Sequence, residues 1–353
     1  MSCVSATFCW AVGSYNADDG TGSKTLAERW DGVAWRGATT PDAALGGGGG
    51  DELDSVSCVA LTDCWAVGGG EGYGSNSLAE HWDGSSWTVV ATQNEVGGHL
   101  NAVDCVDADD CWAGGFYGTP GNPSGPGGLL LEHWTGEAWT IDPAFPATTT
   151  SNIDAIEGLT CTAADDCWGV GSPSNSNPGG PLIVHWDGAA WRSISPLSRS
   201  PVVSLSSVAC TTASHCFAVG SSTPFFPGSS SSSALVEEWD GASWRSNSQA
   251  LNGALSGVAC PSAGMCIATG NAPLTTGAMS QPISYVWDGA TWQPATVPAP
   301  SASTPPYQSG LPVFDLAAVS CPSSADCWAV GSAPTASAYG QRVLAEQWSA
   351  DPG

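Results

Sequence analysis

Pairs of cysteines with five residues between them recur seven times along the chain, and this feature constrains the fold more than any other. The first cysteines of successive pairs are 47 to 61 residues apart, and no cysteine falls outside the pattern. A period of this size is typical of a repeat built from a few short strands. The pairs are Cys3/Cys9, Cys58/Cys64, Cys105/Cys111, Cys161/Cys167, Cys210/Cys216, Cys260/Cys266 and Cys321/Cys327.

The tryptophans follow the same period. The second copy predicts three strands, and a fourth begins at Trp87. The three are 53–58 (Leu-x-x-Val-x-Cys), 64–68 (Cys-Trp-Ala-Val-Gly) and 78–82 (Leu-Ala-Glu-His-Trp). These segments are short, rich in β-branched and aromatic residues, and bounded by Gly, Ser or Asp. We expect every Trp to pack between neighbouring repeats. All 18 occupy three repeat positions: Trp10, Trp65, Trp112, Trp168 and Trp328 in the second strand; Trp30, Trp82, Trp134, Trp186, Trp239, Trp287 and Trp348 in the third; Trp35, Trp87, Trp139, Trp191, Trp244 and Trp292 in the fourth.

Cysteine spacing and tryptophan position are independent patterns, and both give the same seven units. They predict an all-β fold, a seven-bladed β-propeller of four-stranded antiparallel blades with one intra-blade disulfide in each. We expect a single domain over 1–353, whose last blade lacks its outer strand. The predicted blades are 1–40, 53–93, 100–143, 156–196, 205–249, 255–297 and 316–353.

The cysteine pairs are better explained as disulfides than as metal ligands, and we include all fourteen cysteines among the site residues as disulfide partners. Zinc would need further ligands converging on one place, yet His81, His133 and His185 share one repeat position and therefore belong to different blades. We expect no cofactor. Calcium is the alternative, because acidic loops can coordinate it, and the densest acidic group is Asp107, Asp109 and Asp110 in one Cys-x5-Cys turn.

Charge and cysteine usage limit the partners and the compartment. Lys and Arg number 7 against 33 Asp and Glu, a net charge of −26, which argues against nucleic acid and anionic membrane surfaces. No apolar run reaches the length of a membrane span, so we expect no membrane insertion. Fourteen paired cysteines indicate an oxidising, extracellular or cell-surface location. Because no signal peptide is visible, we expect a leader that was removed or a fragment of a longer exported chain.

A carboxylate stands two residues before the third-strand Trp in five copies. A strand alternates its side chains, so this Glu shares a face with Leu and Trp and should be buried. We expect backbone or Trp N–H partners rather than a catalytic role. The residues are Glu28, Glu80, Glu132, Glu237 and Glu346.

The segment Trp30–Trp35, Trp-Asp-Gly-x-x-Trp, and its five counterparts resemble the tectonin and Asp-box propeller repeats. Together with Cys-Trp-Ala-Val-Gly they also resemble repeats of secreted bacterial propellers. An Asp-box has one residue between Asp and Gly, whereas here the two are adjacent. The resemblance implies a blade with a turn between its third and fourth strands, and it implies no catalytic residues.

The loops predict where a ligand binds. The turns inside Cys-x5-Cys and Asp-Gly-x-x-Trp are short and uniform, whereas the loops at the opposite end of the blades are long and differ between copies. Variable loops on a rigid scaffold are usual binding sites, and aromatic side chains there can stack on sugar rings. The candidate ligand-binding residues are Tyr15, Tyr73, Phe116, Tyr117, Phe225, Phe226, Tyr307 and Tyr339.

These observations favour a non-enzymatic, secreted binding or scaffold propeller that binds carbohydrate through the variable loops. The alternative is a structural subunit of an oligomeric extracellular assembly, joined to another protein chain through the open edge of the last blade. A sialidase-like glycoside hydrolase is less favoured. That resemblance implies three clustered arginines, but Arg36, Arg192 and Arg245 follow fourth-strand tryptophans in separate blades.

Overall fold

A computed structural model describes most of the repeat positions of the chain. It describes residues 1–17, 22–41, 50–70, 76–93, 97–118, 127–142, 155–172, 181–194, 203–222, 233–273, 280–297, 315–334 and 341–349. All regular elements in these ranges are β-strands. No helix long and apolar enough to cross a membrane occurs in the described part of the chain.

The chain divides into two compact units. The first, Met1–Arg199, contains four sheets of four strands each. Their strands are β1 (Ser2–Ser5), β2 (Phe8–Asn16), β3 (Ser23–Trp30) and β4 (Trp35–Ala38); β5 (Asp51–Ala60), β6 (Asp63–Gly70), β7 (Ser77–Trp82) and β8 (Trp87–Val89); β9 (His99–Asp107), β10 (Asp110–Tyr117), β11 (Gly128–Trp134) and β12 (Trp139–Ile141); and β13 (Ala155–Ala163), β14 (Asp166–Ser172), β15 (Leu182–Trp186) and β16 (Trp191–Ser193).

The second unit, Ser200–Gly353, contains two sheets of four strands and one that has three strands in its described residues. Its strands are β17 (Val203–Thr212), β18 (His215–Ser222), β19 (Ser233–Trp239) and β20 (Trp244–Ser246); β21 (Ala254–Ser262), β22 (Met265–Pro273), β23 (Ser280–Trp287) and β24 (Trp292–Ala295); and β25 (Asp315–Ser323), β26 (Asp326–Pro334) and β27 (Gln341–Ser349).

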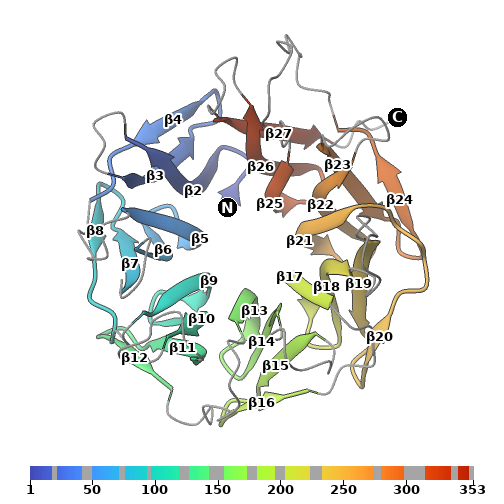
Figure 1. Ribbon diagram of the computed structural model, residues 1–353, viewed down its shortest axis with the longest axis horizontal. Helices are drawn as coiled ribbons and strands as arrows, with labels where there is room; N and C mark the ends of the chain where they lie inside the picture. The colour runs from blue at the N-terminus through green and yellow to red at the C-terminus, as the bar shows by residue number, and fades with distance from the viewer. Residues whose placement is uncertain are drawn as a thin grey trace. The chain divides into compact units, whose positions relative to one another are not determined.

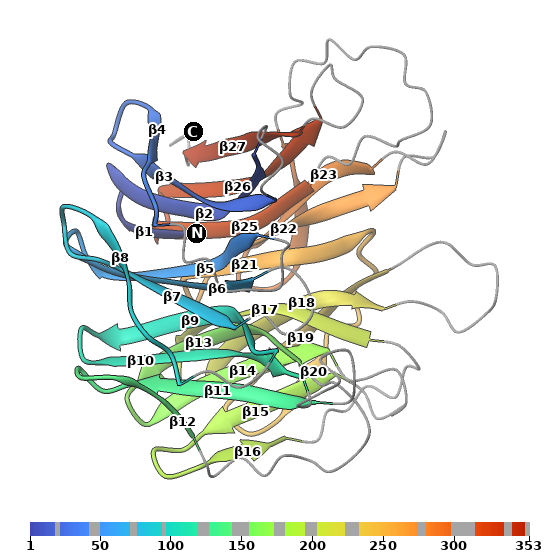
Figure 2. The same ribbon diagram turned by 60° about the vertical axis from the view of Figure 1, so that its left-hand side comes forward.

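Each sheet is an antiparallel meander in chain order, and the seven sheets are the blades of a seven-bladed β-propeller (Figure 1). The predicted fold class is therefore confirmed. Within the first unit, Figure 2 shows β9 to β12 of the third blade in sequence order from the side. The single domain over 1–353 stays a prediction.

A disulfide joins the first two strands of every blade, as predicted. Cys58 and Cys64, for example, face each other as partners of β5 and β6, and their Cα atoms are 4.0 Å apart. All seven pairs form in this way and no cysteine is free. Each bridge closes a short hairpin, so it stabilises the fold by about 2 kcal/mol in the chain-entropy model.

The second cysteine of every pair is buried, whereas the first is only partly buried. Cys64, for example, packs in one core cluster with Trp10 and Leu78. The pairing is as predicted, and the second cysteines belong to the core. Because at most 1 % of each is exposed, they are core residues and cannot contribute to an accessible site. They are Cys9, Cys64, Cys111, Cys167, Cys216, Cys266 and Cys327.

Aromatic side chains pack one blade against the next. The indole of Trp65 in the second blade lies 4.6 Å from Trp134 and 5.1 Å from Trp139 in the third, measured between ring centroids. The same arrangement joins Trp10 to Trp82 and Trp87, Trp112 to Trp186 and Trp191, and Phe217 to Trp287 and Trp292. The predicted packing role is confirmed at these positions.

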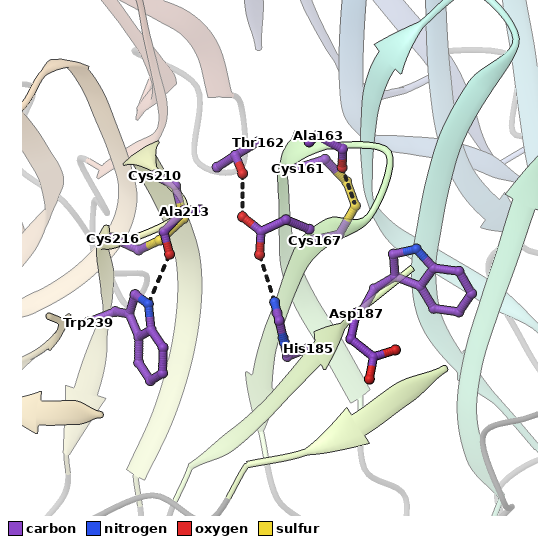
Figure 3. Close-up of polar contacts among 12 residues, drawn as sticks. Cys161, Thr162, Ala163, Cys167, His185, Asp187, Cys210, Ala213, Cys216 and Trp239 are labelled. Carbon is purple, nitrogen blue, oxygen red and sulfur yellow. Dashed lines mark hydrogen bonds and ion pairs between the residues drawn. A yellow bond between two sulfur atoms is a disulfide. The ribbon is translucent and has the colours of Figure 1, made fainter. Parts of the chain in front are cut away.

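The third-strand tryptophans also tie the sheet to the disulfide hairpin. In the fifth blade the indole N–H of Trp239 donates to the carbonyl of Ala213, at 3.1 Å (Figure 3). Four blades of the first unit repeat this bond, from Trp30 to Ala6, Trp82 to Leu61, Trp134 to Ala108 and Trp186 to Ala164. A partly buried indole N–H needs an acceptor, and the tight hairpin turn supplies one.

Histidines of the third strand pair with an aspartate of the second strand in the same blade. His133 Nε2 lies 2.6 Å from Asp110, and its ring stacks on Trp112 with centroids 4.2 Å apart. Figure 3 shows the equivalent His185, which contacts the carboxylate of Asp166. His81 and Asp63 form the third pair, at 2.9 Å. These histidines therefore have a structural role within separate blades.

The turn between the third and fourth strands is stabilised by its aspartate. Asp31 Oδ1 accepts hydrogen bonds from the backbone N–H groups of Val33 and Ala34. Gly32, which follows Asp31, has a φ of +88°, which glycine adopts without steric cost. The hydrogen bond from Arg36, then those backbone bonds, hold the pKa of Asp31 at about 2. Arg192 and Arg245 pair with their own turn aspartates in the same way, so the three arginines serve three separate turns.

The repeated glutamate of the third strand is buried in several blades. Glu132 is 0 % exposed and its Oε2 accepts the backbone N–H of Gln93 at 3.2 Å, so the predicted backbone partner is confirmed there. Glu237 instead accepts the hydroxyl of Ser246 at 2.7 Å, so the predicted type of partner is wrong at this position. Burial raises the pKa of Glu132 to about 7, although the Gln93 amide and the Ser77 hydroxyl lower it.

Replacing a second-strand tryptophan should destabilise the propeller strongly. Trp112 is 2 % exposed and contacts two tryptophans of the fourth blade, so Trp112→Ala should lower the free energy of unfolding by about 3–5 kcal/mol. Trp112→Phe should cost much less, because Phe217 fills this position in the fifth blade. Chemical denaturation of the oxidised protein measures both values, and equal losses for the two variants would contradict this account.

The stability of the protein should fall as the pH rises above about 5. The folded pKa of Glu132, about 7, lies above its ordinary 4.5, so the folded state binds more protons between these values and loses stability as the pH rises through them. Urea denaturation at pH 5 and pH 8 should show the fall, and Glu132→Gln should remove on the order of 2 kcal/mol of it. Asp83→Asn is the control: its lowered pKa affects stability only below about pH 4. A Glu132→Gln profile identical to that of the wild type would refute the assignment.

Candidate binding site

Polar side chains occupy two positions of the first strand in the second, third and fourth blades, with Ala155 as the exception. These positions lie six and four residues before the first cysteine of the copy, on either side of a buried Leu or Ile. In the second unit the same positions hold Ser or Ala, with one Asp. The pairs of residues are Glu52/Asp54, His99/Asn101 and Ala155/Glu157 in the first unit, and Ser204/Ser206, Ala254/Ser256 and Asp315/Ala317 in the second.

These side chains meet across β5, β9 and β13. The Nε2 atom of His99 lies 2.7 Å from Asp54 Oδ2 and 3.8 Å from Glu52 Oε1. Asn101 Nδ2 donates to Glu157 Oε2 at 3.3 Å and to the carbonyl of Ile156 at 2.8 Å. We call Glu52, Asp54, His99, Asn101 and Glu157 the histidine–carboxylate cluster.

The imidazole of His99 fits between two residues that are unusual for their repeat position. A Cβ atom on Gly69 would lie 2.5 Å from His99 Nδ1, so a larger residue there would displace the ring. Phe116 stacks on the imidazole, with centroids 5.6 Å apart and planes 9° from parallel. Ser14, Ser172, Ser221, Asn271 and Ser332 occupy this position in the other blades. His99 therefore stacks on Phe116 and occupies space that a side chain at position 69 would fill.

The carboxylates of the cluster are more accessible than its histidine. The side chain of His99 is 14 % exposed, whereas those of Glu52 and Asp54 are 31 % and 36 % exposed. Burial lowers the pKa of His99, but the hydrogen bond to Asp54 and the charges of Asp54, Glu52 and Glu157 together raise it above its ordinary value. Burial also raises the pKa of Glu157. The cluster is an accessible, negatively charged site around a fixed imidazole.

The cluster lies at the end of the blades where the sequence predicts binding. The first strands run from the cluster to the disulfide hairpins, so Glu52 and His99 stand at the opposite end from the uniform turns. The loops between the second and third strands emerge at this same end. The site is thus next to segments that differ between copies.

The predicted aromatic residues have different surroundings. Tyr15 in β2 is 49 % exposed. Phe116 stacks on His99, and Tyr117 packs partly buried against the core of the third blade. Their roles in ligand binding stay predictions. Tyr73, Phe225, Phe226, Tyr307 and Tyr339 lie outside the described residues.

The acidic group suggested for calcium is engaged in its own hairpin. Asp107 accepts the backbone N–H of Asp109 at 2.9 Å, and Asp110 pairs with His133. Calcium at this turn stays a prediction.

Sequence reasoning did not identify the histidine–carboxylate cluster. It compared histidines by their shared repeat position, and His99 has no counterpart in the other copies. The signal that identifies it is the concentration of Glu52, Asp54, His99, Asn101 and Glu157 in three consecutive copies, whereas Asp315 is the one ionisable residue at these positions in the second unit.

No protein-family model and no curated protein matches this chain. Among solved structures, one described as YCF48 bound to D1 peptide is similar, with a TM-score of 0.58 and 14% identity over 99% of this chain and 91% of that one. YCF48 from Cyanidioschyzon merolae has a TM-score of 0.53 and 11% identity, covering 91% and 95%. A GH74 xyloglucanase from Xanthomonas campestris has a TM-score of 0.55 and 14% identity. The match covers 92% of this chain and 53% of the xyloglucanase. At such identities the likeness shows the fold alone.

Removing the carboxylate beside His99 should lower the pKa of this histidine. Asp54 supplies the hydrogen bond and the nearest charge that oppose the effect of burial, so Asp54→Asn should move the value downward. NMR titration of the imidazole C–H signals measures it, with Asp63→Asn as a control that changes the partner of His81 only. A His99 signal whose titration is unaffected by Asp54→Asn would show that the pair does not form in solution.

Proposed function

We propose that this chain is a non-enzymatic, extracellular or cell-surface binding propeller that holds a protein segment at the variable-loop end of its second to fourth blades. The observation that carries the proposal is the histidine–carboxylate cluster, which three neighbouring first strands form at this end. Binding residues are commonly found beside variable loops that a rigid scaffold positions. The seven disulfides, typical of an oxidising compartment, support the location.

A protein segment fits the described part of this surface better than a glycan. Sugar rings stack on free aromatic faces, but His99 covers one face of Phe116, and Tyr117 packs against the core. The cluster instead offers carboxylates, an amide and an imidazole, which suit polar side chains and backbone groups. One propeller of similar fold is described as bound to a peptide, which is in keeping with this choice. Kinship with tectonin and Asp-box repeats is part of the proposal and is supported by the aspartate-stabilised turns.

Two observations favour a binding role over hydrolysis. Asp54 and Glu157 are hydrogen-bonded to His99, Asn101 and Ser172, so both carboxylates already stabilise neighbouring strands. The arginines that a sialidase-like site would cluster pair with separate turn aspartates. The similar xyloglucanase makes an assay for glycan hydrolysis a necessary control.

A second candidate is a structural subunit joined through the last blade. In the described residues its sheet is β25-β26-β27, so β27 has no fourth strand beside it there. An open edge strand can pair with a strand of another chain. A monomer in sedimentation velocity across a wide concentration range would exclude self-association through this edge.

The proposed function can be tested by selecting peptides from a phage-displayed dodecapeptide library on the full oxidised chain, with a glycan array in parallel. Selected peptides should bind the wild type and lose at least about tenfold in affinity for the double variant Glu52→Gln, Asp54→Asn, since a lost polar pair in a binding site costs about 1.4 kcal/mol or more. Asp63→Asn, in a His–Asp pair of the second and third strands, should bind them like the wild type.

Three outcomes would overturn the proposal. They are peptides that bind all variants equally, selective glycan binding that depends on Tyr15, and hydrolysis of an arrayed glycan. The second outcome would establish the carbohydrate-binding role predicted from the aromatic loops, and the third an enzymatic one.

A further inference from the structure

Three side chains of the histidine–carboxylate cluster converge closely enough to share a ligand. One ligand atom from each of Glu52, Asp54 and His99 lies within 4.8 Å of the other two. Two ligand atoms of a tetrahedral ion with bonds of about 2.1 Å lie about 3.4 Å apart. The His99–Asp54 distance of 2.7 Å is shorter than this, and the His99–Glu52 distance of 3.8 Å is longer. The three side chains would therefore have to rotate to take up ligating positions around one ion.

The types of donor atom select the ion. One imidazole nitrogen and two carboxylate oxygens form a mixed set that suits Zn²⁺ and related divalent transition metals. Ca²⁺ and Mg²⁺ prefer sites made of oxygen alone. The set leaves at least one coordination position open, because zinc takes four ligands.

The imidazole is already oriented toward the two carboxylates. Gly69 and Phe116 confine the ring, and its Nε2 atom points at Asp54 and Glu52. Metal sites depend on such surrounding contacts to orient their ligands. Glu157 lies within electrostatic reach of both Asp54 and His99, so the cluster brings three carboxylates to a single imidazole. A divalent cation would offset this excess of negative charge.

The other His–Asp pairs show what is particular to this site. His81, His133 and His185 each have one carboxylate at Nε2 and lie against the tryptophan of their own blade. In the described residues, Glu52, Asp54 and His99 are the one group of three ligating side chains that meets the distance criterion. Two consecutive first strands, β5 and β9, supply this group, and no pair inside a single described blade reproduces it.

We propose that Glu52, Asp54 and His99 bind one divalent transition-metal ion of the Zn²⁺ class. The inference deepens the proposed function and rests on it for its purpose, since the open coordination position would accept an imidazole or carboxylate of the bound segment. It departs from the sequence-based expectation of no cofactor, which took no account of a pairing across two blades.

The test is a titration of the metal-depleted full chain with ZnCl₂, followed by calorimetry, with bound metal counted by mass spectrometry. The wild type should bind one equivalent, and excess Ca²⁺ should not displace it. His99→Gln and Asp54→Asn should each weaken binding at least about tenfold. His133→Gln is the matched control: it removes the histidine of a His–Asp pair that has no second carboxylate, and it should bind Zn²⁺ like the wild type.

A further measurement guards against misfolding of His99→Gln, because the wild-type imidazole is largely buried and stacks on Phe116. Glu52→Gln changes a more exposed side chain and should weaken binding while leaving the thermal unfolding of the metal-free protein unchanged. With Cu²⁺ as a probe, electron paramagnetic resonance should show one nitrogen ligand in the wild type and none in His99→Gln.

Two results would overturn the inference: the absence of a saturable single site, and equal affinities for the wild type, His99→Gln and Asp54→Asn, which would indicate non-specific binding to an acidic surface. No peptide is present in this titration. If selected peptides bind equally well in the presence of a metal chelator, peptide binding does not need the metal and the proposed function is supported without it. If the chain binds Zn²⁺ but no peptide, the metal site is supported and the proposed function is not.

Discussion

The packing of a second-strand aromatic ring between two tryptophans of the next blade is the contact on which this propeller depends. Each blade is a small sheet with little core of its own, so its apolar face must be buried by a neighbour. Trp65 illustrates the solution, because its indole lies against Trp134 and Trp139 and is almost wholly buried. Within each unit, repetition of this contact from blade to blade builds the core.

Local devices keep each blade in the shape that this packing requires. In the second blade, the Cys58–Cys64 disulfide closes the first hairpin, the Trp82 indole bonds to that hairpin, and Asp83 closes the second turn. Thr135 replaces the turn aspartate in the third blade. All three devices act near the same end of the blade. The opposite end therefore has few constraints from the repeat, and departures from it, such as Glu52 and His99, occur there at little cost to the fold.

The histidine–carboxylate cluster illustrates how a site can arise within a repeat. Gly69 lacks the side chain that would exclude His99, and Phe116 stacks on the ring. These two residues and the side chains of the cluster come from adjoining blades, so the cluster depends on the same packing that forms the core.

The amino-acid sequence by itself determined the number of blades, the disulfide pairing and the role of the tryptophans. Cys58 and Cys64, or Trp82 and Trp87, are separated by only a few residues. Because such short-range patterns recur in copy after copy, they specify the hairpins of each blade without knowledge of the tertiary structure. The partner of a buried carboxylate was harder to predict, since Glu132 and Glu237 occupy one repeat position but bond to different groups. The cluster was decided by the tertiary structure alone. Asp54 and His99 are 45 residues apart, and only the packing of β5 beside β9 brings their side chains to 2.7 Å. A repeat pattern shows which positions are alike, whereas the contact between two blades depends on how their strands are placed in space.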